Sequence, residues 1–321
     1  MSAQAAGETR PHSKYDRLIA AAKAVRTVTT IVVHPCDETS LRGAVDAAEA
    51  GIIKPILVGP AAKITAAAAK HNINIAGYEI VEAEHSEAAA AKGVELIHAA
   101  KGEVLMKGSL HTDELMRSVT AKATGLRTDR RISHVFVMDV PTYAETIFVT
   151  DAAINIFPDL DGKRDIIQNA IDLFNQAGFG TNPRVAILSA VETVTSKIPS
   201  TIEAAALCKM ADRGQITGGL LDGPLAFDNA IDVEAARIKG IKSEVAGRAQ
   251  ILVVPDLEAG NMLAKNLAYF AKADGAGVVL GARVPIVLTS RADTPRARMA
   301  SCAVAALQAD ARRRQAVNAA A

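Results

Sequence analysis

The sequence has few aromatic residues, no tryptophan and almost no net charge. Phe, Trp and Tyr make up 3% of its 321 residues, too few for the stacking surfaces that bind single-stranded nucleic acid. Lys and Arg number 36 against 35 Asp and Glu, so there is no broad basic field to attract a polyanion. We therefore expect no nucleic-acid partner, and any bound anion must be held by a local cluster of basic residues.

Disulfide, export and membrane signals are also missing. The three cysteines, Cys36, Cys208 and Cys302, lie far apart and form no C-x-x-C pair, which argues against a disulfide framework or a zinc site. Residues 1–18 are polar and lack the apolar stretch of a secretory signal. No run of 18 apolar residues occurs, so we expect no membrane span. These features favour reduced thiols in a cytoplasmic protein.

Several catalytic motifs are absent as well. The chain has no G-x-x-x-x-G-K-[ST] phosphate loop, no G-x-G-x-x-G after a strand, no G-x-S-x-G and no H-E-x-x-H. The seven histidines show no spacing typical of metal ligands. These absences disfavour ATPases, the usual Rossmann dehydrogenases, serine hydrolases and zinc hydrolases, and they predict no metal site.

What the chain does have is an alternation of short apolar runs with longer helical segments. Helices are expected over 14–26, 40–51 with Ser40 as the N-cap, and 86–100. Strands are expected over 30–35, 55–60, 78–83, 135–140, 184–190, 250–256, 276–281 and 284–290. This pattern predicts an α/β fold of the doubly wound type, in which ligands bind at the carboxyl ends of the strands.

Two polar segments have both a ligand-binding and a structural interpretation. Lys107-Gly108 followed by Ser109 suits an anion, because glycine lets backbone N–H groups approach phosphate oxygens. It equally suits a solvated turn before a helix capped by Thr112 or Asp113. Residues 124–131 contain three arginines that either grip a phosphate or form an exposed charged loop.

Two further segments leave the same choice open. Asp222 and Asp228 flank an apolar turn, where they either orient a ligand or cap the next helix. The segment VPIVLTSRADTP, residues 284–295, delivers a hydroxyl, a guanidinium and a carboxylate to the end of an expected strand. It is either a ligand site or simply a helix start capped by Ser290 or Thr294.

Taken together, nine segments resemble the phosphate acetyl/butyryl transferase family, in the same order and over about residues 24–306. They are 55–59, 105–115, 124–128, 133–139, 150–160, 185–192, 222–231, 255–265 and 284–293. Segments 105–108 and 222–231 look more like the butyryl branch. The resemblance implies two α/β/α domains of the isopropylmalate dehydrogenase type, with the ligand cleft between them. Residues 1–141 plus 283–321 would form a discontinuous first domain, and 142–282 an inserted second domain.

The family's reaction converts acyl-CoA and phosphate reversibly into acyl phosphate and CoA. The resemblance therefore implies CoA or acyl-CoA, phosphate and acyl phosphate as small-molecule substrates, no required cofactor, and a homodimer or higher homo-oligomer. A CoA thiol with an ordinary pKa of about 8.5 needs a base, the acyl carbonyl oxygen needs hydrogen-bond donors, and the leaving phosphate needs a cation.

The resemblance also assigns site residues. Ser290 and Arg291 match the family's Ser-Arg pair, which contacts the thiol or carbonyl region and holds the acyl phosphate. Asp293, in the butyryl-like Ser-Arg-Ala-Asp pattern, is either the base or an orienting residue. The expected substrate-binding residues are Lys107, Gly108, Arg117, Thr289 and Arg283, the last as a substitute for an arginine that the acetyl branch carries after its Gly-Asn step.

Two alternative functions remain open from the sequence. A metal- and NAD-dependent decarboxylating dehydrogenase of the same fold would need carboxylates such as Asp222 and Asp228 as metal ligands. A non-catalytic CoA-binding partner of a larger complex would keep the binding residues and have no turnover.

Overall fold

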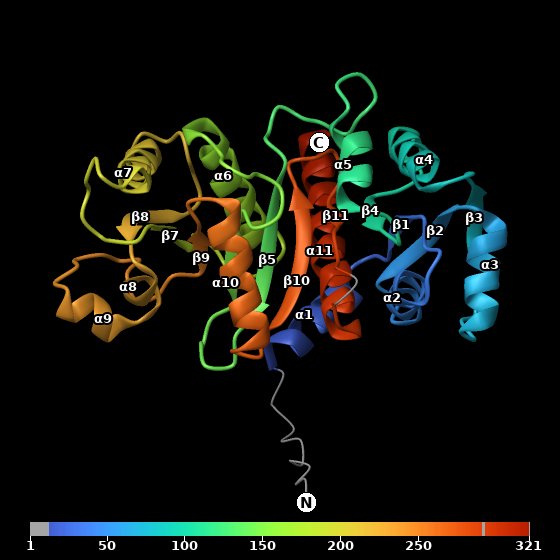
Figure 1. Ribbon diagram of the computed structural model, residues 1–321, viewed down its shortest axis with the longest axis horizontal. Helices are drawn as coiled ribbons and strands as arrows, with labels where there is room; N and C mark the ends of the chain where they lie inside the picture. The colour runs from blue at the N-terminus through green and yellow to red at the C-terminus, as the bar shows by residue number, and fades with distance from the viewer. Residues whose placement is uncertain (1–12, 291–292, 321) are drawn as a thin grey trace, which may run out of the picture.

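The computed structural model describes residues 13–290 and 293–320, and its strands form one mixed sheet (Figure 1). In their hydrogen-bonding order the strands are β3 (Glu79–Glu82), β2 (Ile53–Gly59), β1 (Val28–Val33), β4 (Val104–Lys107), β11 (Ile286–Val287), β10 (Asp274–Leu280), β5 (Ser133–Asp139), β6 (Ile147–Thr150), β9 (Ile251–Val253), β7 (Arg184–Leu188) and β8 (Leu220–Leu225). The predicted α/β class is confirmed.

The helices cover both faces of this sheet. They are α1 (Ser13–Ala24), α2 (Glu38–Glu49), α3 (Ala61–Lys70), α4 (Ser86–His98), α5 (Thr112–Thr120), α6 (Leu160–Gln176), α7 (Pro199–Asp212), α8 (Phe227–Ile231), α9 (Val233–Ile238), α10 (Leu257–Tyr269) and α11 (Pro295–Ala320). Among the described residues, none of these helices combines the length and apolar character needed to cross a membrane.

The centre of the sheet departs from the parallel arrangement typical of doubly wound folds. β10 pairs antiparallel with both β11 and β5, and β5 pairs antiparallel with β6. The outer strands on each side, such as β1 with β2 and β7 with β9, pair in parallel. The strands on the two sides of this centre therefore run in opposite directions.

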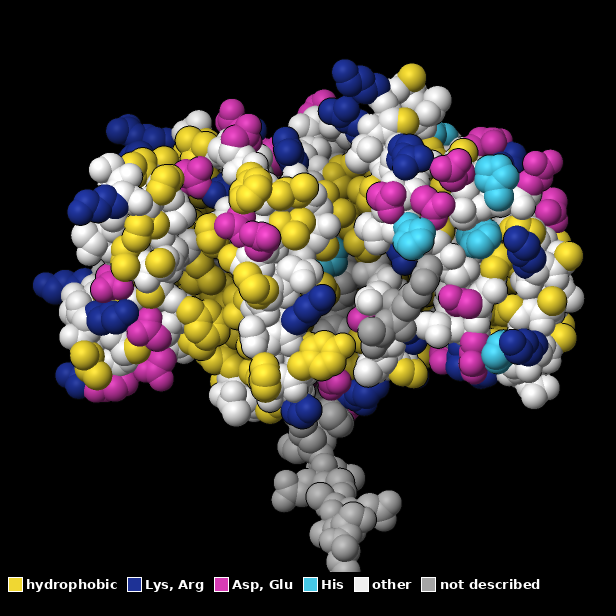
Figure 2. All heavy atoms as spheres, viewed as in Figure 1, with side chains coloured by type: hydrophobic (Ala, Val, Ile, Leu, Met, Phe, Trp, Pro, Cys, Tyr) yellow, Lys and Arg dark blue, Asp and Glu magenta, His cyan; other side chains and the backbone are white. Residues whose placement is uncertain are grey.

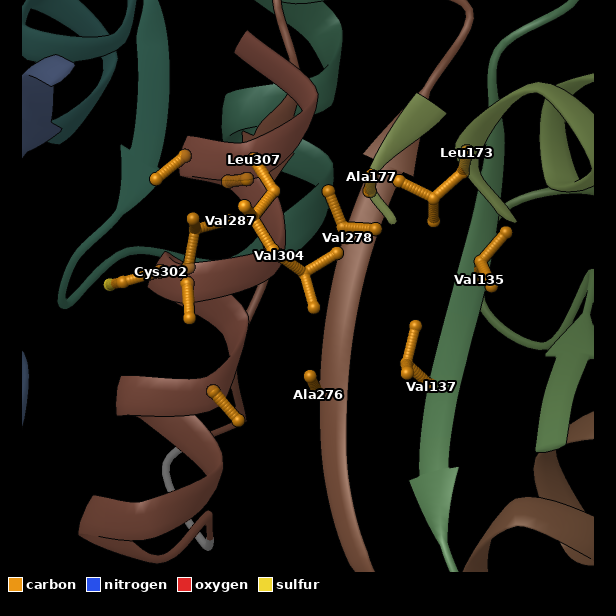
Figure 3. Packing of buried hydrophobic residues seen from close by; sticks show 14 of the residues in the cluster. Val135, Val137, Leu173, Ala177, Ala276, Val278, Val287, Cys302, Val304 and Leu307 are labelled. Atoms are coloured by element: carbon orange, nitrogen blue, oxygen red, sulfur yellow. The ribbon is translucent and has the colours of Figure 1, made fainter. Parts of the chain in front are cut away.

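The apolar core is continuous on one face of the sheet and divided on the other. On the first face, residues of α2, α6, α7 and α11 pack in one cluster over strands from both halves. On the second face, α4 and α5 cover one cluster, while α8, α9 and α10 cover another. Figure 3 shows Val304 of α11 and Leu173 of α6 packed against the central strands β10 and β5.

The predicted division into domains falls within this central region. It places β10 in the inserted domain and β5 and β11 in the first domain, although β10 lies between these two strands. One sheet thus runs across the predicted boundary, and the division itself stays a prediction.

Individual elements differ from the sequence predictions in three respects. The N-cap of α2 is Asp37, not Ser40, because the Asp37 carboxylate accepts the Ser40 backbone N–H at 2.8 Å. The expected strand 284–290 is paired only at Ile286–Val287. Three strands, β4, β6 and β8, were not predicted; β8 includes the Asp222 segment that the sequence indicated as a turn.

Candidate active site

Three parallel strands of the first half end at the same edge of the sheet. β1 and β11 both pair in parallel with β4, the latter through Ile286 with Leu105 and Val287 with Met106. The residues that follow these strands are 34–37, 108–109 and 288–290. Because the carboxyl ends of neighbouring parallel strands are adjacent, the fold gathers these three segments, as expected for a ligand site of an α/β protein.

Gly108 is the point where the first two segments come closest. Its backbone N–H donates to the Val33 carbonyl at 2.9 Å, and the Ser109 N–H donates to the His34 carbonyl at the same distance. A Cβ on Gly108 would lie 2.3 Å from the Val33 oxygen and 2.6 Å from the His34 oxygen. The Gly108 N–H is therefore used by the sheet rather than turned to an anion, and the glycine is required for the close approach of β1.

The Ser109 hydroxyl fixes the turn after β1. It donates to the His34 carbonyl at 2.7 Å and accepts the Cys36 N–H at 3.0 Å. Burial lowers the pKa of His34, so its imidazole is neutral at pH 7. Burial also raises the pKa of Cys36 to about 11, so this thiol is protonated at neutral pH and unsuited to act as a nucleophile.

Lys107 links β4 to the segment after β11. Its side chain comes from the last residue of β4 and is 7% exposed. The ammonium Nζ lies 3.5 Å from the carbonyl oxygens of both Gly108 and Thr289. A buried ammonium is costly unless it is offset by nearby polar or anionic groups, and this one lies in the region to which an anionic substrate is assigned.

Ser290 and Asp293 are hydrogen-bonded to each other at the end of this segment. The Asp293 carboxylate accepts the Ser290 backbone N–H at 2.7 Å, and the Asp293 N–H donates to the Ser290 carbonyl at 3.1 Å. Ser290 is exposed and Asp293 is half-buried. Burial raises the pKa of Asp293, against the opposing effects of the Ser290 N–H, Arg298 and Lys107. Arg291, the predicted phosphate ligand, lies outside the described residues.

Arg298 is a member of the site that the sequence prediction missed. It is 7% exposed and its positive charge lowers the pKa of Asp293. Its side chain packs over α2, where a Cβ on Gly43 would come within 2.9 Å of the Arg298 Cδ. The sequence contained one signal for Arg298, namely its position in the first turn of the helix that starts just after Asp293. That helix is capped by Thr294, whose hydroxyl accepts the Ala297 N–H at 3.1 Å.

The loop after β6 lies at the amino end of β5, where the Asn155 Nδ2 donates to the Ile132 carbonyl at 2.9 Å. The Asp151 carboxylate accepts the N–H groups of Ala153 and Ile154 at 2.9 and 3.0 Å, which shapes this loop. Ile154 packs against the same apolar cluster as Leu288. Gly260 of α10 lets that helix approach, since a Cβ there would lie 2.8 Å from the Asp151 carbonyl. The family-like segment 150–160 and the strand that delivers Ser290 thus contact one common apolar cluster.

Two predicted substrate-binding arginines are not brought to this group. Arg283 precedes β11, so it lies at the amino end of that strand, opposite to the end that carries Thr289. The Arg117 side chain of α5 is 68% exposed and pairs with Glu87 at 3.1 Å and with Asp113 at 3.9 Å. The assignment of Arg117 to CoA or phosphate stays a prediction.

The other polar segments have structural partners. In the segment 124–131, the Arg131 Nε donates to the Asn155 Oδ1 at 2.8 Å, while Arg130 lies 3.8 Å from Asp172. Their guanidinium groups thus have different partners and do not form one phosphate grip.

The two carboxylates that a dehydrogenase would need have separate partners. The Asp228 carboxylate pairs with Lys239 at 3.1 Å, and the Asp222 carboxylate accepts the Gly223 N–H at 2.8 Å. Within residues 13–290 and 293–320, no three His, Cys, Asp or Glu side chains gather as metal ligands would. α5 begins after His111 as its N-cap, rather than after Thr112 or Asp113.

Comparisons with known proteins agree with this arrangement. A model of the phosphate acetyl/butaryl transferase family matches residues 87–306. Phosphate acetyltransferase from Rhizobium meliloti is 73% identical over 94% of this chain and 95% of its own length. Phosphate butyryltransferase from Clostridium acetobutylicum is 40% identical over 92% of this chain and 98% of its own length. The crystal structure of a branched-chain phosphotransacylase from Enterococcus faecalis V583 has a TM-score of 0.77 at 27% identity, covering 88% of this chain and 99% of that one.

These matches bear on the two predicted branches differently. The relative named for acetyl transfer is more similar to this chain than the one named for butyryl transfer, so the butyryl-like segments do not by themselves indicate the length of the acyl group. The family model covers more than half of the chain, and both relatives align with nearly all of it. The chain belongs to the phosphate acetyl/butaryl transferase family.

Proposed function

We propose that this protein transfers a short acyl group reversibly between CoA and inorganic phosphate, with residues 289–293 as the reacting segment. Acetyl is its preferred acyl group. The choice of acetyl is supported by the 73% identity with a phosphate acetyltransferase. The observation that carries the proposal is the convergence of a buried cation, Lys107, with the hydrogen-bonded pair Ser290 and Asp293 at the carboxyl ends of β4 and β11.

The proposed chemistry assigns a role to each group. In the direction of acyl-CoA formation, the CoA sulfur attacks the carbonyl carbon of the acyl phosphate, while the thiol proton passes to the Asp293 carboxylate. The electrons of the broken C–O bond leave with the phosphate, and Asp293 returns its proton to phosphate or solvent. Burial raises the pKa of Asp293, which brings this carboxylate closer to the pKa of about 8.5 of the thiol it must deprotonate.

Charge on the phosphate and on the carbonyl oxygen is offset by donors from the same segments. The Lys107 ammonium lies next to Thr289, and the Ser290 hydroxyl extends from an exposed residue. By the family motif, Arg291 contributes the cation that holds the acyl phosphate. In a partly dehydrated site such preorganised donors stabilise the transition state more than they do in water.

The remaining features of the proposal concern the assembled enzyme. CoA enters as a substrate, no separate cofactor takes part, and the enzyme works in the cytoplasm as a homodimer or higher homo-oligomer, with its ligand cleft between the two predicted domains. The oligomer is supported by exposed apolar residues bordering α10, where Ile156 is 61%, Met262 60% and Phe270 87% exposed. Figure 2 shows apolar side chains gathered over this helix and the elements beside it. Light scattering during size-exclusion chromatography measures the oligomeric state.

The activity test measures thiol release from acetyl-, propionyl- and butyryl-CoA in the presence of phosphate. We expect release, highest with acetyl-CoA. Ser290→Ala and Asp293→Asn should each lower kcat by about two to three powers of ten with unchanged melting temperature. Ser196→Ala, at an exposed serine after β7, is the matched control and should retain activity. Absence of thiol release with all three substrates would refute the proposal, and NADH formation would support the dehydrogenase instead.

A further inference from the structure

A polar pocket lies far from the proposed reacting segment, between α6 and the carboxyl end of α11. It has a volume of about 260 Å³ and is also lined by the connection between β10 and β11 and by the loop before β5. In Figure 1 these parts meet beside the end of α11, near the tip of the β10 arrow. Pro295 and Arg312 are 17 residues apart on α11, which separates the pocket from the reacting segment by roughly 25 Å.

The pocket wall carries an excess of positive charge. Arg130, Arg283 and Arg312 line it together with one carboxylate, Asp172. The Arg312 guanidinium is held in place because its Nη1 donates to the carbonyl oxygens of Ala282 at 3.0 Å and Arg283 at 2.7 Å. A positioned guanidinium with further N–H groups is well suited to bind a carboxylate or phosphate.

The pocket also contains a buried hydrogen-bond acceptor that lacks a partner. Gln308 of α11 is 4% exposed, and its Nε2 donates to the Gln176 Oε1 at 3.0 Å. Its own Oε1 accepts no hydrogen bond from any described residue. Buried acceptors of this kind are nearly always satisfied, by a protein group, water or a ligand. The Gln308 Oε1 therefore needs a hydrogen-bond donor, in a pocket whose positive charge favours an anion.

We propose that this pocket binds a small dianion that carries a hydroxyl group. The arginines would bind its negative charges, and the hydroxyl would donate to the Gln308 Oε1. A hydroxy-dicarboxylate and hydrogen phosphate share this chemistry. The pocket is smaller than the ~300–1,000 Å³ of pockets that hold drug-sized ligands, so it excludes CoA. The structure also gives Arg283 a place here, at the end of β11 opposite to the reacting segment.

The test uses two pairs of probes that differ only in the hydroxyl donor. Isothermal titration calorimetry on the full-length protein compares L-malate with succinate and phosphate with sulfate, in the presence of saturating CoA, which occupies the reacting segment and carries no acyl group that phosphate could accept. The hydroxylated member of each pair should bind more tightly. Gln308→Leu should weaken malate binding by about 2- to 13-fold, the effect of one hydrogen bond, and leave succinate binding nearly unchanged.

Arginine variants test the charge requirement. Arg312→Met should weaken malate and succinate alike, by at least tenfold. Because Arg312 also bonds two backbone carbonyls, the exposed Arg283→Gln provides a second variant that does not risk the fold. Arg314→Met is the matched control, since Arg314 lies on the same helix and is 64% exposed. Failure of all four probes to bind, or binding that the Gln308 and arginine variants leave unchanged, would overturn the proposal.

Discussion

Replacing Gly108 by alanine tests whether close approach of β1 and β4 positions the reacting groups. The new Cβ would lie 2.3 Å from the Val33 carbonyl oxygen, about 1 Å nearer than the ~3.3 Å typical of close C···O contacts. The obstructing atoms are backbone, so β1 and β4 must separate or tilt. Such overpacking costs about 1–3 kcal/mol. A displacement of ~1 Å at Lys107 would lower kcat/KM by roughly 100-fold.

The assay combines thermal unfolding with thiol release from acetyl-CoA. Gly108→Ala should lower the melting temperature by a few degrees, since 1 kcal/mol corresponds to about 2–4 °C for 150–250 residues and the expected cost is up to about 3 kcal/mol. Gly275→Ala is the matched control in another strand, because its Cβ would meet only the flexible Met138 thioether, at 3.0 Å. Native stability and activity in Gly108→Ala, or equal damage in both variants, would refute the reasoning.

If Asp293 is the base, as proposed, it must be ionised, so activity should fall as pH decreases through its raised pKa. Arg298→Met removes a cation that lowers this pKa and should move the acidic limb of the pH–rate profile to higher pH, whereas Arg298→Lys should not. Cys36, with a pKa of about 11, should react slowly with iodoacetamide at pH 7.5 and faster as the pH rises; rapid labelling of Cys36 at pH 7.5 contradicts this environment. Thr294→Ala removes the N-cap of α11 and should lower the free energy of unfolding by about 0.5–2 kcal/mol, as measured by urea denaturation, whereas Thr294→Ser should restore it.

Local sequence patterns predicted most of the strands but missed the two four-residue strands β4 and β6 and the glycine-containing strand β8. β1 and β2 were found because buried parallel strands read as apolar runs, and β10 (Asp274–Leu280) was found through its apolar second half. β8, Leu220–Leu225, contains an aspartate, a glycine and a proline, which are typical of turns. The antiparallel centre was also beyond local reasoning, because strand direction depends on which distant segments pair.

Site residues within the family motif were predictable from the sequence. Residues whose roles depend on contacts between distant segments were less so. Ser290 and Asp293 were expected together, and their hydrogen bonds join them. Gly108 was assigned to an anion, but its N–H serves the Val33 carbonyl, a contact across strands that no local pattern reveals. Arg298 was missed. Arg283 lies at the amino end of β11, as its position just before the expected strand 284–290 already implied.

The position of β11 between β4 and β10 determines when the sheet can be completed during synthesis. Lys107 and Thr289 are neighbours in the fold but 182 residues apart in the chain. At about 5–20 residues per second of synthesis, the edge of β4 waits roughly 10–35 s on the ribosome for its partner strand. An unpaired strand edge is prone to wrong pairing. The reacting segment is thus assembled late in translation, and a nascent chain that stalls before β11 would retain most of the sheet while lacking Ser290, Asp293 and the strand that carries them.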